Sequence, residues 1–284
     1  MIPRMPSNRD VPLLRRQPLE GAYVLLTFRH PEVAREARAG QFVMIKAGTS
    51  ADPPLRRPFS ILSLDPGEES FTLFIKAVGT GSIALAAMAP GEVAQCLGPL
   101  GRPFAAPPRG TEAVMVAGGY GIAPFHMLSA ELSREGRARQ VFYGGRTVAD
   151  LQVRAPFEAL GVPLTPATED GTLGHRGRVT EPLEAYLDRA PAPVRLYACG
   201  PDAMLHAVAR LAERRGLDTQ VSLDPWMGCG IGTCLGCVVW IQEAEEARPK
   251  YRCACTEGPV FDAATVVWHG EPASLARRRQ ETRA

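Results

Sequence analysis

The sequence predicts three successive units: an antiparallel β-barrel, a doubly wound α/β domain and a small cysteine-rich lobe. Three observations predict this order. The N-terminal part holds short, alternating segments separated by Gly and Pro. Strand and helix patterns then alternate, as they do in a parallel sheet covered by helices. The C-terminal part is rich in cysteine and glycine and lacks regular periodicity. The predicted boundaries are residues 12–108, 109–219 and 220–268.

The bulk composition is that of an ordinary globular protein and argues against several classes. Of 284 residues, 45% are hydrophobic, and the net charge is only +2, which does not favour nucleic acid as a partner. No apolar run reaches the roughly 18 residues that a membrane helix needs. Residues 1–16 contain prolines and charges but no apolar segment, unlike a signal peptide. We therefore expect a cytoplasmic protein, in which the seven cysteines bind metal rather than form disulfides.

The first unit reads as a small barrel of short strands. One short helix, at residues 82–88, interrupts the pattern. Several strands at this spacing, separated by turn residues, are typical of an antiparallel barrel. The predicted strands are 22–28, 41–46, 59–64, 71–77 and 92–97.

The second unit alternates buried strands with helices. Such alternation predicts parallel strands with helices on both faces of the sheet. The predicted strands are 112–117, 140–143, 162–167 and 194–198, and the predicted helices are 123–135, 156–160, 181–188 and 202–215.

The strongest chemical signal is the segment MGCGIGTCLGC, residues 227–237. It places four residues between Cys229 and Cys234 and two between Cys234 and Cys237. With a later cysteine this is the ligand order of plant-type [2Fe-2S] proteins, and soft thiolates suit iron. Cys253 and Cys255 are both available as the fourth ligand, and Cys255 is favoured because it lies nearer the Gly-Pro turn at 258–259. The alternatives are a zinc site, which usually pairs two C-x2-C motifs, and a set of buried free thiols.

Two further motifs lie in the first unit, RRPFSI at 56–61 and GTGS at 79–82. A glycine-rich turn that opens a helix offers free amides to a pyrophosphate, and the planar guanidinium of Arg57 can neutralise a phosphate. Phe59 offers an apolar face to a flavin ring, and Ser60 offers a hydrogen bond to its edge. Each motif alone is also typical of a surface turn, but the pair ahead of an α/β unit indicates a flavin site.

The second unit contains two strand-turn-helix segments suited to a nucleotide phosphate. The first, VMVAGGYGIAP at 114–124, departs from the usual fingerprint because proline stands in place of the last glycine. No acidic residue stands at 144–146, where the second strand ends, so the segment differs from an ordinary dehydrogenase half. Either turn alone is equally typical of a plain loop. The predicted nucleotide-binding residues are Gly118, Gly119, Gly121, Ile122, Ala123 and Pro124, with Cys199, Gly200 and Pro201 at the end of a later strand.

Taken in order, these motifs resemble the ferredoxin-NADP reductase superfamily. More narrowly, the chain resembles the electron-transfer subunits of class 1B dihydroorotate dehydrogenases, over about residues 12–265. The marks that carry this resemblance are RRPFSI, GPLGRPF at 98–104, TEDGTLGHRG at 168–177, MGCGIGTCLGC and CTEGPVF at 255–261.

The resemblance implies an FAD-binding barrel, an NAD-binding domain and a [2Fe-2S] lobe. It implies an FMN-containing dihydroorotate dehydrogenase catalytic subunit as partner, in a heterotetramer of pyrimidine biosynthesis. Electrons would pass from dihydroorotate through the cluster and FAD to NAD+, without a catalytic acid or base in this chain. The residues implied are Arg57, Pro58, Phe59, Ser60, Phe74, Ile75, Lys76, Gly81 and Ser82 for FAD, and Cys229, Cys234, Cys237 and Cys255 for the cluster.

Two alternative functions stay open. The first is the small subunit of a ferredoxin-NADP reductase or sulfide dehydrogenase, a type that commonly places an aspartate among the cluster ligands; four available cysteines argue against it. The second is a zinc-stabilised binding module without redox activity, which would be colourless. The residues do not decide between NAD and NADP, since Arg146 could meet a 2′-phosphate or pair with a surface acid. The extra Cys253 and the run at 224–228 depart from the family pattern.

Overall fold

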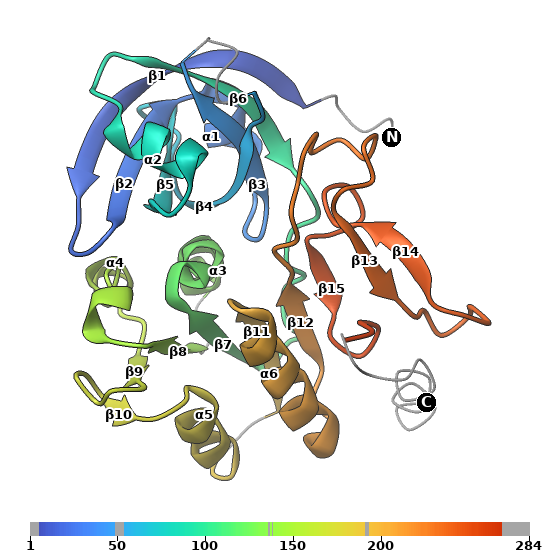
Figure 1. The fold of residues 1–284 in the computed structure, drawn as a ribbon. Helices are drawn as coiled ribbons and strands as arrows, with labels where there is room; N and C mark the ends of the chain where they lie inside the picture. The colour runs from blue at the N-terminus through green and yellow to red at the C-terminus, as the bar shows by residue number, and fades with distance from the viewer. Residues whose placement is uncertain (1–5, 49–53, 136, 138, 191–192, 269–284) are drawn as a thin grey trace.

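The computed structural model describes residues 6–48, 54–135, 137, 139–190 and 193–268, and it contains the three predicted units in order (Figure 1). The first is a closed antiparallel barrel with the strand order β1-β2-β5-β4-β3-β6. Two helices accompany it, α1 (Pro31–Glu36) and α2 (Thr80–Ala87). The strands are β1 (Ser7–Pro18), β2 (Tyr23–Arg29), β3 (Phe42–Ala47), β4 (Arg57–Asp65), β5 (Ser70–Lys76) and β6 (Val93–Leu100).

Strand β1 was not predicted from the sequence, although it closes the barrel. It pairs with β2 on one side and with β6 on the other. Only Val11 and Leu13 of its residues are buried, and the remainder, apart from the partly buried Leu14, is polar, charged or proline. A strand that buries so little apolar surface has no clear alternation, and long-range pairing defines it instead.

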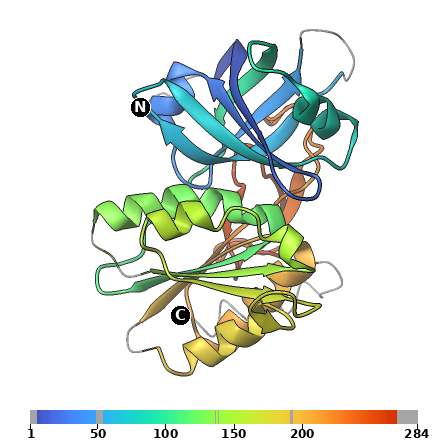
Figure 2. The ribbon, with the colours of Figure 1, turned by 90° about the vertical axis from the view of Figure 1, so that its left-hand side faces the viewer.

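The second unit is built on a seven-stranded sheet with the order β10-β9-β8-β7-β11-β12-β15. Figure 2 shows α3 and α4 on the face toward the barrel and α5 and α6 on the opposite face. The strands are β7 (Glu112–Gly118), β8 (Arg139–Gly145), β9 (Leu164–Thr168), β10 (His175–Arg176), β11 (Val194–Cys199) and β12 (Thr219–Ser222). The helices are α3 (Ala123–Arg134), α4 (Ala155–Ala159), α5 (Thr180–Leu187) and α6 (Asp202–Arg215), with short 3-10 turns η1 (Gly119–Ile122) and η2 (Val148–Asp150).

The order of the strands places a topological switch point between β7 and β11. From β7 the chain continues outward through β8, β9 and β10, and then returns to add β11 and β12 on the other side. In such sheets ligands bind outside the carboxyl ends of the strands where the direction reverses. The two predicted glycine turns, after β7 and after β11, meet at this point.

The third unit is joined to the sheet of the second. A hairpin of β13 (Val238–Ile241) and β14 (Lys250–Cys253) follows the cysteine loop, and β15 (Val260–Asp262) then pairs antiparallel with β12. These strands are too short, at three to four residues, to show periodicity in the sequence. The predicted boundary between 219 and 220 falls inside β12.

One continuous apolar cluster joins the barrel to the second unit. At the junction Phe104 stacks on Phe125 of α3, with ring centroids 5.6 Å apart, and meets Tyr197 of β11 edge-on at 5.5 Å. Aromatic side chains bury large apolar areas, so this junction holds the two units in a defined orientation. Among the described residues, no helix has the length and apolar character that crossing a membrane requires.

Candidate functional site

The cysteine loop, residues 227–237, directs backbone amides toward its own sulfur atoms. The amides of Ile231 and Cys234 donate to Cys229 Sγ at 3.5 and 3.4 Å, and the amide of Gly236 donates to Cys234 Sγ at 3.5 Å. Burial raises the pKa of Cys229, but these N–H donors outweigh it and lower that pKa to about 6. Donors aimed at sulfur favour the thiolate, which is the form that binds metal.

The segment that follows β14 brings two more thiols to the same place. Cys255 Sγ accepts the amide of Gly232 at 3.2 Å, and Cys253 lies beside Cys237 because it pairs with Val238 across the β13–β14 hairpin. Burial, followed by the neighbouring Cys237, raises the pKa of Cys255 to about 12. The structure thus gathers the three loop cysteines and both candidates for the fourth ligand around one point.

The donors at this point, cysteine sulfur atoms with backbone amides directed at them, are those of a sulfur-ligated metal centre. Within the described part of the chain, no three His, Cys, Asp or Glu side chains are placed to hold one ion together. A [2Fe-2S] cluster requires only two protein thiolates on each iron. Amide donors to sulfur, as found at Cys229 and Cys255, are also one of the features that tune such clusters.

The motif RRPFSI lies at the start of β4 and faces the first turn of α2. The Arg57 guanidinium donates to the carbonyl of Leu55 at 2.7 Å and lies against Gly81, where an added Cβ would be 3.0 Å from Arg57 Cγ. The Ser82 hydroxyl accepts the amides of Val78 and Gly79, each at 3.0 Å. The amides at the start of α2 have no acceptor within the helix, so this turn and Arg57 together can hold an anionic group.

The other residues predicted for FAD divide by their burial. Pro58, Phe59 and Ser60 are only partly buried in β4 and remain accessible to a ligand. Phe74 is 3% exposed and stacks on Tyr23, and Ile75 is fully buried in the barrel. The apolar side chains of these two β5 residues are therefore closed off, and only their backbone can contact a ligand.

Lys76, also predicted for FAD, connects the barrel to the second unit. Its Nζ lies 2.8 Å from Asp150 Oδ1, which accepts the Tyr23 hydroxyl at the same distance. Burial raises the pKa of Asp150, but the hydrogen bonds from Lys76 and Tyr23 outweigh it and lower that pKa. Sequence reasoning did not single out Asp150 or Tyr23, because their meeting depends on how the two units pack.

Asp150 also supplies an acidic group at the carboxyl end of β8, where none was expected. The turn η2 brings its carboxylate back to the strand end, and Asp150 Oδ2 accepts the amide of Arg146 at 3.1 Å. In many dinucleotide-binding sheets an acidic residue at this strand end contacts the ribose. The Arg146 side chain is 76% exposed and lies beside the same carboxylate.

The two glycine turns of the second unit pack directly against each other. A Cβ on Gly121 would lie 2.4 Å from the carbonyl oxygen of Cys199, so no other residue fits there without a backbone shift. Ile122, Ala123 and Pro124 are buried and anchor the start of α3. The contact surface at the switch point is therefore mainly backbone. The predicted residues gathered at this edge are Gly118, Gly119, Gly121, Cys199, Gly200 and Pro201.

Tyr120 connects the first glycine turn to the chain that leads into the cysteine loop. It is 49% exposed, and its hydroxyl lies near the carboxylate of Asp224. Burial, followed by the charge of Asp224, raises the pKa of Tyr120. Sequence reasoning missed this pair, since only the meeting of the two turns with the third unit brings them together.

The cysteine loop packs on the barrel strand beside the RRPFSI motif. A Cβ on Gly230 would lie 2.5 Å from Met44 Cγ, and Gly230 also has a positive φ of +76°. Met44 of β3 is the direct cross-strand partner of Pro58 in β4. The cysteine loop therefore packs on β3, the strand that pairs directly with the part of β4 that carries the predicted flavin motif.

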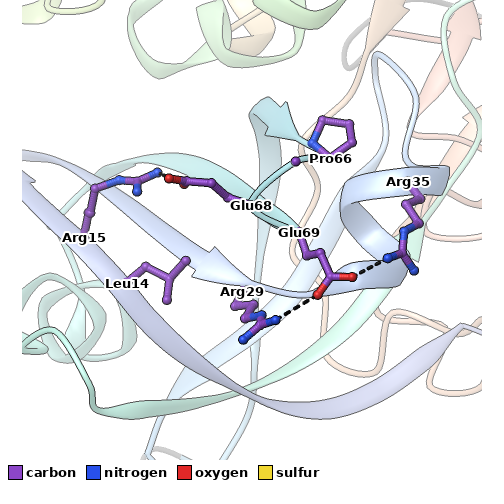
Figure 3. Close-up of a pocket in the computed structure, with 8 residues that line it drawn as sticks. Leu14, Arg15, Arg29, Arg35, Pro66, Glu68 and Glu69 are labelled. Atoms are coloured by element: carbon purple, nitrogen blue, oxygen red, sulfur yellow. Dashed lines mark hydrogen bonds and ion pairs between the residues drawn. The ribbon is translucent and has the colours of Figure 1, made fainter.

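Figure 3 shows a hollow on the outer face of the barrel, away from these motifs. Its arginines are paired with acids: Arg15 contacts Glu68 at 2.6 Å, and Arg29 and Arg35 both contact Glu69. None of the predicted site residues lines it. Because each arginine is already paired with a glutamate and no predicted site residue lines the hollow, it is not a candidate site.

Two family models match the second and third units. Residues 115–210 match the oxidoreductase NAD-binding domain, and residues 224–267 match the iron-sulfur cluster binding domain of dihydroorotate dehydrogenase B. An electron transfer subunit of dihydroorotate dehydrogenase B (NAD(+)) from Desulforamulus reducens is 35% identical, over 86% of this chain and 92% of that protein. The corresponding subunit from Bacillus caldolyticus is 38% identical, over 85% and 91%.

A solved structure resembles the whole chain. It is that of an NADH-dependent reduced ferredoxin-NADP oxidoreductase, described in connection with flavin-based electron bifurcation. The TM-score is 0.80 at 26% identity, and the match covers 96% of this chain and 95% of that one. The match extends over the barrel, the sheet and the lobe together.

Proposed function

The chain belongs to the family of dihydroorotate dehydrogenase B electron transfer subunits, and from this premise we propose that it carries electrons from an FMN-containing, dihydroorotate-oxidising catalytic subunit to NAD+ in pyrimidine biosynthesis. We assign a [2Fe-2S] cluster to Cys229, Cys234, Cys237 and Cys255, and FAD to the barrel. When bound, the cluster supplies single-electron transfer, and the flavin exchanges between one-electron and two-electron chemistry.

The observation that carries this proposal is the packing of the cysteine loop on the barrel. Gly230 contacts Met44, whose cross-strand partner Pro58 belongs to the predicted flavin motif. A cluster held by this loop therefore adjoins a flavin held by β4 and α2. Such closeness is what an electron path within one chain requires, whereas a binding module stabilised by zinc has no need of it.

The barrel residues position the flavin rather than react with it. Arg57 and the first turn of α2 present a cation and free amides to a pyrophosphate. Phe59 and Ser60 lie next along β4 and are accessible to a ring system. Lys76 is held at the mouth of the barrel by Asp150. We assign none of these residues a role as catalytic acid or base.

The switch point between β7 and β11 is the proposed NAD site. The backbone amides of its two glycine turns can donate to a pyrophosphate. Asp150 lies at the strand end where, in related sheets, an acidic residue binds the ribose. Asp150 also contacts Lys76 and Tyr23 of the barrel, so this edge faces the unit to which we assign the flavin. We further propose a heterotetramer of two catalytic and two electron-transfer chains.

The test is an absorption spectrum of the anaerobically purified chain, with iron and sulfide assayed on the same sample. We expect flavin bands and about two iron and two sulfide per chain. Addition of the catalytic subunit and dihydroorotate should then reduce NAD+. A colourless protein that contains zinc, or oxidation of dihydroorotate by this chain alone, would contradict the proposal.

One alternative is supported by a specific observation, the likeness to the reduced ferredoxin-NADP oxidoreductase structure. That likeness, at 26% identity, is weaker than the 35–38% identity to the dihydroorotate dehydrogenase subunits. Four cysteines gathered at one point also leave no need for an aspartate ligand. Reduction of NAD+ by reduced ferredoxin, but not by dihydroorotate with its catalytic subunit, would favour the alternative.

A further inference from the structure

Five cysteines, one more than a [2Fe-2S] cluster needs, gather at this place: three in the cysteine loop and two in the segment at the end of β14. Cys253 is the additional one, and its side chain is only 9% exposed. It is the last residue of β14, where it pairs with Val238, the residue that follows Cys237. The amide of the next residue, Ala254, donates to the carbonyl of Cys237 at 3.1 Å. The backbone thus fixes Cys253 beside a cluster ligand.

Cys253 and Cys255 both lie beside Cys237, because Cys253 pairs with Val238 and the amide of Ala254, between the two cysteines, donates to the Cys237 carbonyl. A tight turn holds the two in place, since the carbonyl of Cys253 accepts the amides of Thr256 and Glu257 at 3.1 and 2.8 Å. Cys255 differs in one respect, because its sulfur also accepts the amide of Gly232 from the cysteine loop at 3.2 Å. This donor favours Cys255 as the resident ligand and leaves Cys253 as its neighbour.

We propose that Cys253 is a reserve ligand of the cluster, able to replace Cys255 on the iron that Cys255 binds. This inference rests on the proposed function, which supplies the cluster. The exchange is a substitution: the bond from iron to Cys255 sulfur breaks, the bond from iron to Cys253 sulfur forms, and the proton of the Cys253 thiol passes to the released thiolate or to water. Neither iron changes its oxidation state.

The experiment compares full-length variants purified anaerobically. Iron and sulfide are measured relative to FAD, and the reduced proteins are examined by electron paramagnetic resonance. We expect Cys253→Ala to keep the wild-type spectrum. We expect Cys255→Ala to keep at least about half of its iron, with shifted g-values, since four thiolates still meet the cluster's ligand count. The double variant and Cys234→Ala should lose the cluster.

Two controls separate this inference from a general loss of folding. Cys96→Ala removes a buried cysteine of the barrel, in β6, and should leave the cluster unchanged. FAD content and the melting temperature report whether each variant is folded. If Cys255→Ala fails to fold, Cys255→Ser is compared with and without Cys253→Ala, and a reserve thiolate predicts two different spectra.

Loss of iron from folded Cys255→Ala to the level of Cys234→Ala would overturn the inference, as would identical spectra for the two serine-containing variants. Loss of the cluster from Cys253→Ala would overturn it too, because Cys253 would then be a required ligand. A wild-type chain without iron and sulfide would instead refute the proposed function.

Discussion

The nucleotide edge and the cysteine loop perform neighbouring tasks with opposite means. At the nucleotide edge, regular strands and helices end at a switch point, and two glycine turns expose backbone with hardly any side chain. In the cysteine loop, the backbone is irregular and the function depends on sulfur atoms from a few side chains. We therefore expect substitutions that add atoms to damage the nucleotide edge, and substitutions that remove a sulfur atom to damage the cysteine loop.

The largest effect should come from removing one sulfur in the cysteine loop. Cys234→Ala leaves the cluster short of a ligand that no neighbouring thiol is placed to replace. Changes in the outer shell of metal sites already cost about 10–100-fold, so we expect transfer from dihydroorotate to NAD+ to fall by more than about 100-fold. Oxidation of NADH by an artificial acceptor, which needs only FAD, should continue. Equal loss of both activities would mean that the loop also supports the flavin site.

The next largest effect should come from adding one carbon at the nucleotide edge. In Gly121→Ala the new Cβ would lie 2.4 Å from the Cys199 carbonyl, so the two turns must separate. Overpacking of this kind costs about 1–3 kcal/mol. We expect a rise of about tenfold in the KM for NAD+, with unchanged iron content. Gly67→Ala, in an exposed turn of the barrel, is the control. An unchanged KM for NAD+ in Gly121→Ala would contradict the expectation that added atoms damage the nucleotide edge.

A smaller effect is expected where the nucleotide edge meets the barrel, at Asp150. The pKa of Asp150 is lowered in the folded chain from its usual value of 3.8. Its carboxylate therefore stabilises the fold at pH values above 3.8, and this contribution is lost as the pH falls through the lower pKa of the folded chain. Asp150→Asn should reduce the free energy of unfolding at pH 7 by on the order of 1 kcal/mol. The difference should shrink in urea titrations carried to about pH 3.5. If the difference in the free energy of unfolding stayed constant between pH 7 and about pH 3.5, the ion pair would be excluded as its cause. The control is Asp10→Asn, at an exposed position of β1.

The smallest effect should come from the hollow on the outer face of the barrel (Figure 3). Arg35→Ala removes one of the two arginines that contact Glu69 and leaves Arg29 in place. Exposed ion pairs contribute about 0.2–1 kcal/mol, and salt screens them. We expect a small drop in melting temperature at low salt, none at high salt, and unchanged turnover. A loss of turnover would show that this surface matters to function after all.

The same contrast explains which parts of the fold and of the candidate site could be predicted from the sequence. Strands β7 and β11 are continuous buried runs followed by glycine turns, so these elements were predictable, whereas nucleotide binding by their turns stays a prediction. The cysteine spacing indicated the cluster, but not the choice between Cys253 and Cys255, because both residues lie beside Cys237 in the fold. Spacing along a chain does not resolve two neighbours that fold onto the same point.

Features that depend on packing between units were missed. Strand β1 buries only Val11 and Leu13, so its pairing rather than its pattern defines it. Asp150 follows its strand by several residues and returns through a turn, so the end of β8 looked free of acids. The meeting of Asp150 with Tyr23 and Lys76 joins residues more than 70 positions apart. Such contacts become visible only when the whole fold is known.

One dipeptide, Gly258-Pro259, joins all three units. The carbonyl of Gly258 accepts the amide of Arg102 from the barrel side at 2.6 Å, and the carbonyl of Pro259 accepts the amide of Leu223, just beyond β12, at 2.9 Å. Strand β15 follows at once and completes the sheet. Because one short segment of the lobe is bonded to both of its neighbours and completes the sheet, a chain that loses its lobe should lose thermal stability in the other two units as well.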